Sequence, residues 1–277
     1  MIRAAYLGPQ GTFSEEAATA FGRFCGFSLL KPYPAISLCV RAVEKGEADY
    51  AVVPLENSLA GSVPETLDLL TAGTELKIQA ELDVPIELCL LALEAETEAI
   101  RKICSHPQAL DQCRNFLQQN FPEVPTIPVL STAEAAAMAV AQGKGTAAIA
   151  GRKAAEQYGL MVLAAGIEDN ISTTRFIALG RENSSLLRPE KTSLVFSVKN
   201  VAGSLYTVLR AFAEYKVNLT RIESRPAKSR LGEYIFFVDL DGTLQDAAVQ
   251  AAVREAAAEA VMLKLLGSYP VLRRSRA

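Results

Sequence analysis

The sequence has few of the side chains that metal sites and nucleophilic enzymes use most. It has one histidine, His106, and five cysteines without CxxC spacing. A protease-type triad needs a base beside its nucleophile and a zinc site needs clustered ligands, so the sequence supports neither, and we expect no metal. An odd number of cysteines, mostly in apolar surroundings, indicates reduced core thiols rather than disulfides. The cysteines are Cys25, Cys39, Cys89, Cys104 and Cys113.

The sequence also lacks a strong charge of one sign and a long hydrophobic run. Its formal net charge is -3, with 21% charged and 50% hydrophobic residues. This balance argues against nucleic acid or an anionic membrane surface as the main partner. No run reaches transmembrane length, and residues 1–11 lack the basic segment and apolar core of a signal peptide. We therefore expect a cytoplasmic globular protein, and 277 residues suit about two domains.

The first predicted strand, residues 2–7, is followed by a glycine turn and a capping box at residues 12–15 that opens a helix. Backbone N–H groups at such a helix start favour a carboxylate or phosphate. The lysine of a Walker loop and GxGxxG spacing are both absent, so nucleotide binding is not expected. The alternative is a glycine turn that only reverses the chain.

Strands and helices alternate through the first 180 residues, which predicts parallel or mixed α/β sheets. We expect buried strands at residues 50–54, 146–150 and 86–93, the last linking two lobes. Ligands in such folds collect at the carboxyl ends of strands, so Asn57, in a polar turn after residues 50–54, is a candidate donor.

Two later helix starts carry polar residues. Ser105 is predicted to cap a helix that Pro107 begins, with Gln108 and Gln112 one turn apart on one face. A lone His106 beside a proline is more often a structural hydrogen-bonding residue than an acid or base. The second start is a capping box at residues 131–134, in which Glu134 most simply caps its own helix.

Residues 169–180, DNISTTRFIALG, combine a hydroxyl-rich turn, a cation and an apolar strand. This pattern places Thr174 and Arg175 at a strand mouth, where side chains can meet a ligand. The alternative is a loop with a strand cap, and Arg175 could instead pair with Glu56 or Asp169. Phe176 is predicted to lie in the core.

Residues 181–190 are polar and contain a proline, which is typical of a linker. Beyond them the pattern predicts strand, helix, two strands, helix and strand. This βαββαβ order is the ferredoxin-like arrangement of small domains. The residues after 270 end in RRSRA, which we expect to fray.

These segments together resemble the prephenate dehydratase family. The resemblance is carried by GPQGTFSEEAA (8–18), PLENSLAGSV (54–63), SHPQALDQC (105–113), STAEA (131–135) and STTRF (172–176). NVAGSLYTVL (200–209) and NLTRIESRP (218–226) resemble the ACT regulatory domain. Ser204, Leu205 and Tyr206 depart from the residues that this family more often has after the glycine. Because no chorismate mutase segment precedes Met1, the resemblance is to the monofunctional form.

The resemblance implies an α/β fold with a two-lobed catalytic region, similar to type II periplasmic binding proteins, and a ferredoxin-like ACT domain. The expected boundaries are 1–181 for the catalytic domain, 182–190 for the linker, 191–270 for the ACT domain and 271–277 for the tail. The implied reaction is the decarboxylating dehydration of prephenate to phenylpyruvate in L-phenylalanine biosynthesis, without a cofactor. Arogenate dehydratase and a non-catalytic amino-acid-sensing binding protein are the alternatives.

The resemblance also implies roles for individual residues. The expected catalytic residues are Thr174, Asn57, Ser105, Gln112 and Glu134, with Thr174 as hydrogen-bond donor or proton relay to the ring hydroxyl. The expected substrate-binding residues are Arg175, Thr12, Phe13, Ser58 and Thr173. Feedback by L-phenylalanine is expected where two ACT domains meet in a homodimer or homotetramer. The expected effector residues are Gly203, Ser204, Leu205, Asn218, Leu219, Thr220, Glu223, Ser224, Arg225 and Pro226.

Overall fold

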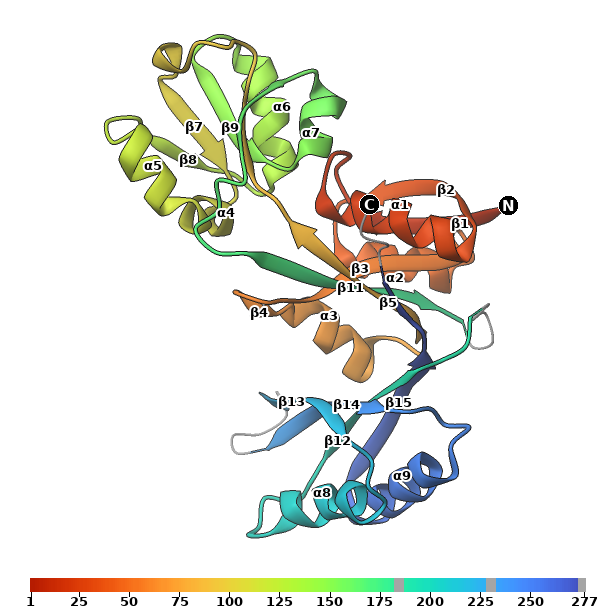
Figure 1. Cartoon of the computed structure of the whole chain (residues 1–277). Coiled ribbons are helices and arrows are strands. Elements are labelled where there is room, and N and C mark those ends of the chain that lie inside the picture. Colours follow the sequence, from red (N-terminus) through yellow and green to blue (C-terminus); the bar gives the residue numbers. More distant parts are fainter. Residues whose placement is uncertain (182–186, 228–232, 274–277) are drawn as a thin grey trace. The chain divides into compact units, whose positions relative to one another are not determined.

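The computed structural model describes residues 1–181, 187–227 and 233–273. They form two compact units, which Figure 1 colours along the chain. The first unit contains residues 1–66 and 82–176, and the second contains residues 67–81 and 177–273. The second unit therefore includes a segment far from the C-terminal domain in sequence.

Elements up to the middle of the chain are β1 (Ile2–Leu7), α1 (Phe13–Cys25), β2 (Phe27–Tyr33), α2 (Ile36–Glu44), β3 (Tyr50–Asn57), β4 (Gly61–Ser62), α3 (Pro64–Asp68), a π-helical turn (Leu69–Gly73), β5 (Lys77–Ile86), β6 (Cys89–Ala92) and a 3-10 turn (Thr97–Ala99). The chain continues through β7 (Lys102–Ser105), α4 (Pro107–Gln112), α5 (Arg114–Asn120), β8 (Thr126–Pro128), α6 (Thr132–Gln142), β9 (Thr146–Ala150), α7 (Arg152–Tyr158), β10 (Met161–Ala165) and β11 (Ser172–Gly180). The last elements are β12 (Lys191–Ser197), α8 (Ser204–Glu214), β13 (Leu219–Pro226), β14 (Tyr234–Asp241), α9 (Ala247–Glu259), β15 (Met262–Tyr269) and β16 (Val271–Leu272).

The first lobe of unit 1 is built on a sheet that includes the order β5-β11-β3-β1-β2. Strand β1 pairs in parallel with both β2 and β3, as the alternation of strands and helices predicted. Helix α1 buries Ala17, Ala18 and Phe21 and ends at Gly26, whose φ of 73° is the left-handed conformation that glycine tolerates best. This packing fixes the start of α1 at the carboxyl end of β1.

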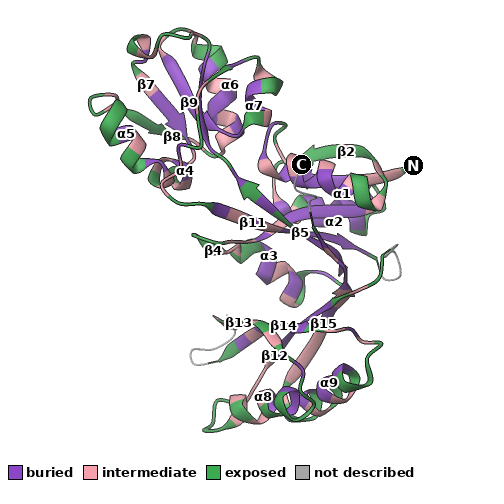
Figure 2. Cartoon of the chain, in the orientation of Figure 1, coloured by how far each residue is buried: buried purple, intermediate pink, exposed green. Residues whose placement is uncertain are grey.

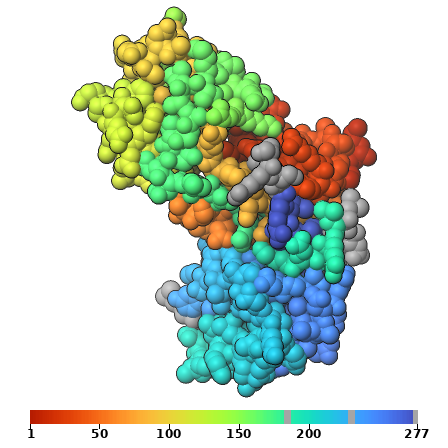
Figure 3. Space-filling view, in the orientation of Figure 1, coloured from red at the N-terminus to blue at the C-terminus, as the bar shows by residue number. Residues whose placement is uncertain are grey.

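The second lobe is a smaller sheet with the order β10-β6-β9-β7-β8, flanked by helices α4 to α7. All five residues of β9 are buried, and they appear purple in Figure 2. Their small side chains let α6 and α7 pack closely on the sheet, in a core cluster that includes Ala136, Ala148 and Ala154. The yellow-to-green atoms at the top of Figure 3 belong to this lobe.

The predicted single strand at residues 86–93 is wrong. The structure instead has β5, which ends at Ile86, and β6, which begins at Cys89 in the other sheet. Between them the Leu88 N–H donates to Glu168 Oε2 at 2.9 Å. The segment looks like one strand because the strand ends on both sides of the break are buried, each in a different sheet. Only Glu87, which is exposed and pairs with Arg152, interrupts the apolar run at the break.

The ferredoxin-like arrangement at the C-terminal end is confirmed. Its sheet has the order β13-β14-β12-β15, and helices α8 and α9 cover the core built around Phe196, Phe212 and Val238. The elements follow in the predicted order of strand, helix, two strands, helix and strand. Val271 and Leu272, which we assigned to the tail, form β16, whereas residues 182–186 of the expected linker and 274–277 of the tail lie outside the described residues.

A chain of buried polar groups runs through the second unit. Lys191 Nζ lies 2.6 Å from Glu81 Oε1, and the Tyr269 hydroxyl donates to Glu81 Oε2 at 3.3 Å. Ser193 Oγ lies 2.6 Å from the Tyr269 hydroxyl and donates to Asp239 Oδ1 at 2.5 Å. Buried charges are retained only with partners, so this network ties the inserted strand β5 to β12, β14 and β15.

In the parts of the chain that are described, no helix has the length and apolar character needed to cross a membrane.

We predict that Glu81→Ala lowers the free energy of unfolding by about 3–5 kcal/mol, because Lys191 then keeps a buried charge without its partner. The Lys191 side chain is 11% exposed and that of Glu81 is 2% exposed. Urea unfolding measures the change. The double variant Glu81→Ala/Lys191→Met should regain much of the loss, and a single variant as stable as the wild type would contradict the prediction.

Candidate functional site

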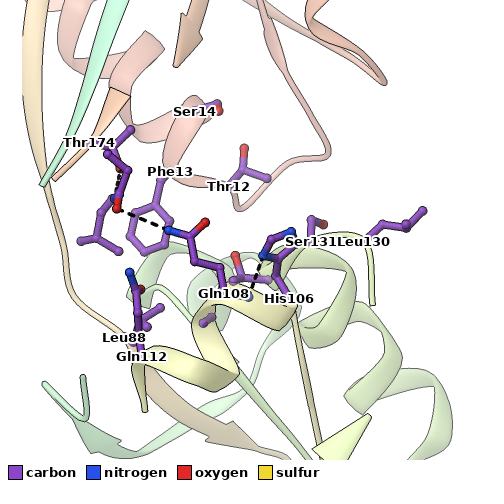
Figure 4. A pocket seen from close by; sticks show the side chains of 14 residues that line it. Thr12, Phe13, Ser14, Leu88, His106, Gln108, Gln112, Leu130, Ser131 and Thr174 are labelled. Atoms are coloured by element: carbon purple, nitrogen blue, oxygen red, sulfur yellow. Dashed lines mark hydrogen bonds between the residues drawn. The ribbon is translucent and has the colours of Figure 1, made fainter. Parts of the chain in front are cut away.

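A cavity of about 210 Å³ lies in the first unit, lined by both lobes (Figure 4). The first lobe contributes the start of α1, the end of β3, the end of β5 and the start of β11. The second lobe contributes the segment after β5 and the starts of α4 and α6. The lining residues are Thr12, Phe13, Ser14, Asn57, Ile86, Leu88, His106, Gln108, Ala109, Gln112, Leu130, Ser131, Thr132 and Thr174.

The side-chain amide of Asn57 has one fixed orientation. Its Oδ1 accepts from the backbone N–H groups of Leu59 at 3.1 Å and Ala60 at 3.0 Å. Its Nδ2 must then face the opposite way, and it donates to Ser172 Oγ at 2.8 Å and Thr174 Oγ1 at 2.9 Å. Two backbone donors in its own turn therefore determine which groups Asn57 presents to β11.

This orientation determines whether the Thr174 hydroxyl donates to a ligand or accepts from it. Because Thr174 Oγ1 accepts a hydrogen bond from Asn57, its own O–H proton is left to donate to another group. Thr174 is 9% exposed and lines the cavity, so the remaining direction for this donor is the cavity. The site thus contains a hydroxyl donor aimed at a bound ligand.

Two helix N-termini supply backbone donors to the same cavity. Thr12 Oγ1 accepts from Glu15 N at 3.3 Å and caps α1, and Ser131 Oγ accepts from Glu134 N at 3.0 Å and caps α6. The first two N–H groups of each helix have no intrahelical acceptor. Phe13, Ser14 and Thr132, which carry three of these groups, line the cavity. Positive dipole ends therefore face the cavity, as an anion requires.

Gln112 adds a buried donor. Its Nε2 is shielded from solvent and has no hydrogen-bond partner among the described residues. A buried polar group without a partner is unfavourable by about 1–3 kcal/mol, so a ligand acceptor at this point would recover that energy. Figure 4 shows the Gln112 amide on the cavity side of α4.

No lysine, arginine, aspartate or glutamate lines the cavity within the described part of the chain. Arg175, our expected substrate clamp, is therefore not among the residues that line this cavity. Side chains alternate along β11, so Ser172 and Thr174 face one way while Thr173 and Arg175 face the other. Arg175 Nη1 lies 3.4 Å from Glu56 Oε2 and Nε lies 3.8 Å from Asp83 Oδ1. The ion pair with Glu56 that we considered as the alternative is the one found.

Four other expected residues also lie outside the cavity lining. The backbone N–H of Thr173 donates to Ser58 Oγ at 3.0 Å. Ser105 is fully buried and donates to Ile149 O at 2.6 Å, so it holds β7 against β9. Glu134 Oε2 accepts from the N–H of Leu130, the residue before the cap Ser131, at 3.0 Å, so Glu134 holds the start of its own helix. The expected Thr12, Phe13, Asn57, Gln112 and Thr174 do come together.

The predicted cap of α4 was wrong. His106, rather than Ser105, is the N-cap, and its Nδ1 accepts from Gln108 N at 3.2 Å. Burial lowers the pKa of His106. This acceptor geometry requires an unprotonated Nδ1, so His106 acts here as a neutral capping residue. The structural interpretation of the lone histidine is the better one.

Several residues that line the cavity were not predicted from the sequence to contact a ligand. Ser131 and Thr132 belonged to a predicted helix start, but only the fold shows that this start faces the same space as α1. Leu130, which is 88% exposed, and the apolar Ile86 and Leu88 gave no polar signal. Gln108 was noticed only for its place on the helix face shared with Gln112.

The expected effector residues fall into two groups within one chain. In the sheet register Lys191 pairs with Asp241 and Leu219 with Leu240, whereas Ser197 pairs with Ile235 and Pro226 with Tyr234. The residues next to Leu219 therefore lie at the end of the sheet where β12 begins. Gly203 follows the other end of β12. Within one chain, Gly203 therefore lies at the same end of the sheet as Arg225 and Pro226, and at the opposite end from Asn218, Leu219 and Thr220.

Several of these residues make hydrogen bonds or ion pairs with other residues of the second unit. Asn218 Nδ2 donates to Asp241 Oδ2 at 2.7 Å, and Thr220 Oγ1 donates to Asp239 O at 3.4 Å. Glu223 pairs with Arg221, and Arg225 Nη1 lies 3.9 Å from Asp68 Oδ1. Leu205 and Leu219 pack on the domain core, and Ser224 pairs with Phe236 in the sheet. Gly203 and Ser204 begin α8.

Fold and site together define a two-lobed α/β protein that offers hydroxyl, amide and backbone donors to an anion and carries a ferredoxin-like domain. The chain belongs to the prephenate dehydratase family, whose model matches residues 4–184. A model of the ACT domain matches residues 192–258. Both matches agree with the resemblance found in the sequence.

Individual proteins are similar to this chain over most of its length. The bifunctional chorismate mutase/prephenate dehydratase of Neisseria gonorrhoeae is 43% identical over 269 residues, 96% of this chain and 74% of the relative. The prephenate dehydratase of Arthrobacter aurescens, solved in complex with L-Phe, is 37% identical with a TM-score of 0.88, covering 97% of this chain and 90% of that one. GqqA, described as a quorum quenching acylase, is 31% identical with a TM-score of 0.86, covering 98% of each chain.

We predict that the stability of the protein falls on acidification in a way that depends on His106. A histidine whose pKa is lower in the folded state binds fewer protons there, so stability is lost as the pH falls through the unfolded value of about 6.5. His106→Asn supplies a cap that does not titrate. Urea unfolding at about pH 8 and pH 5.5 should show a smaller loss for the variant. Equal losses would contradict the neutral cap.

Proposed function

We propose that this protein catalyses the decarboxylating dehydration of prephenate to phenylpyruvate. In this reaction the bond between the ring and its carboxylate breaks, its electrons make the ring aromatic, and the ring hydroxyl leaves. One proton is taken up, and the products are phenylpyruvate, carbon dioxide and water. The large driving force of aromatisation means that the protein needs only to hold a dianion and assist the departing hydroxyl.

The observation that carries this proposal is that the Thr174 hydroxyl is oriented as a hydrogen-bond donor toward the cavity. Asn57 donates to Thr174 Oγ1, so the threonine proton is available to the oxygen that leaves. A threonine hydroxyl is a weak acid, so Thr174 acts as hydrogen-bond donor and relay rather than as a strong acid. A donor that is already oriented lowers the barrier because it does not need to reorganise during the reaction.

The substrate carboxylates are held by neutral donors. We assign the side-chain carboxylate to the N-termini of α1 and α6, at Phe13, Ser14 and Thr132. Gln112 Nε2, the buried donor, is the other candidate partner for a substrate oxygen. The ring carboxylate is then placed beside Ile86 and Leu88, where poor solvation favours loss of its charge as carbon dioxide.

Residues outside the cavity support this arrangement. Arg175 and Glu56 join β11 to β3, and Thr173 and Ser58 do so through their backbone and side-chain bonds. Ser105 holds the sheet of the second lobe, and Glu134 holds the start of α6. They position the site without contacting substrate.

The alternatives are weaker on the same grounds. Arogenate differs from prephenate by an ammonium group, and the cavity offers positive helix ends and no carboxylate to receive it. Acyl transfer, by analogy with GqqA, needs a nucleophile beside a general base. Here the hydroxyls of Thr12 and Ser131 cap helices, and His106 Nδ1 faces a backbone N–H. A binding protein without catalysis gives no role to the Thr174 donor.

We predict that purified protein converts prephenate and that Thr174→Val lowers kcat about 100-fold or more, because the donor to the leaving hydroxyl is lost. Thr174→Ser keeps the donor and should stay within about tenfold of wild type. Thr173→Val is the matched control, since its side chain faces away from the cavity, and it should retain activity within about threefold. Phenylpyruvate absorbance measures turnover, and circular dichroism confirms folding.

Absence of prephenate turnover by the wild type would reject the proposed function. Arogenate and an acyl amide are then the next substrates to test. Equal losses in Thr174→Val and Thr173→Val would reject the assignment of Thr174.

We also propose that L-phenylalanine inhibits the enzyme by binding at the ACT domain. The Arthrobacter aurescens relative was solved with L-Phe, and residues 200–209 and 218–226 carry the ACT resemblance. Asn218 and Gly203 lie at opposite ends of the sheet within one chain, so a site that uses both needs a second copy. We therefore propose a homodimer or homotetramer in which two ACT domains complete each effector site. The effector acts if it binds one arrangement of the lobes more tightly.

We predict that Gly203→Val abolishes inhibition by phenylalanine while turnover without phenylalanine persists. Gly203 has φ of 85°, and a Cβ added there meets no atom within 4 Å, so the side chain would project into open space where the effector is proposed to bind. Gly159→Val is the matched control, with φ of 67° and equally open surroundings. Inhibition curves of both variants measure the effect. Retained inhibition in Gly203→Val would remove Gly203 from the site.

The domain boundaries remain part of the proposal. We assign residues 1–181 to the catalytic domain and 191–270 to the ACT domain, supported by the family matches to 4–184 and 192–258. We also propose a cytoplasmic location, supported by five free cysteines, four of them buried.

A further inference from the structure

The side chain of Gln108 crosses the cavity from the second lobe to the first. Gln108 lies on α4, and its Nε2 donates to Asn57 Oδ1 at 3.3 Å, across the space between the two lobes (Figure 4). Gln108 has no assigned role in the reaction, although it lies beside the pair formed by Asn57 and Thr174.

The direction of the Gln108 amide follows from that of Asn57. Asn57 Oδ1 is an acceptor, because Leu59 N and Ala60 N both donate to it. The group of Gln108 that faces Asn57 must therefore be its NH2, and its Oε1 points elsewhere. Figure 4 shows this oxygen turned toward the α1 side of the cavity. Gln108 thus presents a hydrogen-bond acceptor to any ligand bound there.

Gln108 is not needed to orient Asn57 or to join the lobes. Asn57 Oδ1 already has two backbone donors, so the Asn57 amide keeps its orientation without Gln108. The lobes share another amide contact away from the cavity, where Gln157 Nε2 donates to Gln10 Oε1, also at 3.3 Å. A structural role alone therefore does not explain why the Gln108 oxygen faces the cavity.

The proposed reaction requires a hydrogen-bond acceptor at this point. Thr174 donates to the oxygen of the departing hydroxyl, but the hydroxyl has a proton of its own that needs an acceptor in a closed site. As the C–O bond breaks, that proton stays on the oxygen and becomes one of the two protons of the product water. An acceptor that holds it keeps the lone pair of the oxygen directed at Thr174.

We propose that Gln108 is a substrate-positioning residue that donates to Asn57 with its NH2 group and accepts from the leaving hydroxyl with its carbonyl oxygen. This inference rests on the proposed function. Its hydrogen bond strengthens as the hydroxyl becomes water, so its loss affects kcat more than KM.

Gln108→Met tests the proposal, because methionine has a similar length and neither the donor nor the acceptor. We expect kcat to fall about tenfold or more while KM changes by less than about threefold. Gln157→Met is the matched control, since it removes an interlobe amide hydrogen bond of the same length outside the cavity. It should leave both constants unchanged.

Gln108→Glu gives a second test that a structural role does not reproduce. A protonated carboxyl has one donor and one acceptor, like the amide, whereas a carboxylate cannot donate to Asn57 and repels the dianion. The activity of Gln108→Glu, relative to wild type at the same pH, should therefore rise as the pH is lowered. This profile also decides the matter if Gln108→Met proves too unstable to assay.

The outcomes separate the two hypotheses. If wild type converts prephenate but Gln108→Met keeps both constants within about twofold, Gln108 has no positioning role and the proposed function stands. A Gln108→Glu profile parallel to that of wild type also overturns the role of Gln108. If wild type does not convert prephenate, the proposed function and this inference fail together.

Discussion

The site depends on the orientation of one side-chain amide. Two backbone N–H groups in the turn after β3 fix Asn57 Oδ1, and this determines which of the neighbouring groups donate and which accept. Asn57 Nδ2 must donate to Ser172 and Thr174, which leaves the Thr174 proton for the cavity. An Asn57 rotated by half a turn would present an acceptor to Thr174 and take that proton. The geometry of one turn therefore decides whether β11 offers a donor or an acceptor to the ligand.

In the proposed reaction the cavity binds a dianion although no lysine or arginine is among its described lining residues, and this has a physical advantage. A buried arginine would need its own partners and would attract the ring carboxylate strongly in the ground state. Stabilising a charge that is about to leave as carbon dioxide raises the barrier to its departure. Helix N-termini and amides carry partial charges, so they can bind the carboxylate that stays while Ile86 and Leu88 leave the other poorly solvated.

The sequence predicted the α/β lobes, the βαββαβ domain and five of the cavity residues, because caps, turns and buried strands have local patterns. We grouped Arg175 with Thr174, although the period of two along β11 places their side chains on opposite faces. The sequence did not reveal the break between β5 and β6, since a run with a single charged residue, Glu87, looks much the same whether it belongs to one sheet or to two. It could not bring α1 and α6 to one cavity, because their meeting depends on packing between segments more than 100 residues apart in sequence.

The second unit is not a continuous piece of chain. Residues 67–81 belong to it, and Glu81 from this segment lies in the buried network with Lys191 and Tyr269. A Cβ on Gly267 would clash with the backbone oxygen of Ile78, so β15 passes directly against the inserted strand. The ACT domain therefore is not a cassette that can be cut at the linker and transplanted. A graft would have to carry residues 67–81 with it, or redesign the surface they cover.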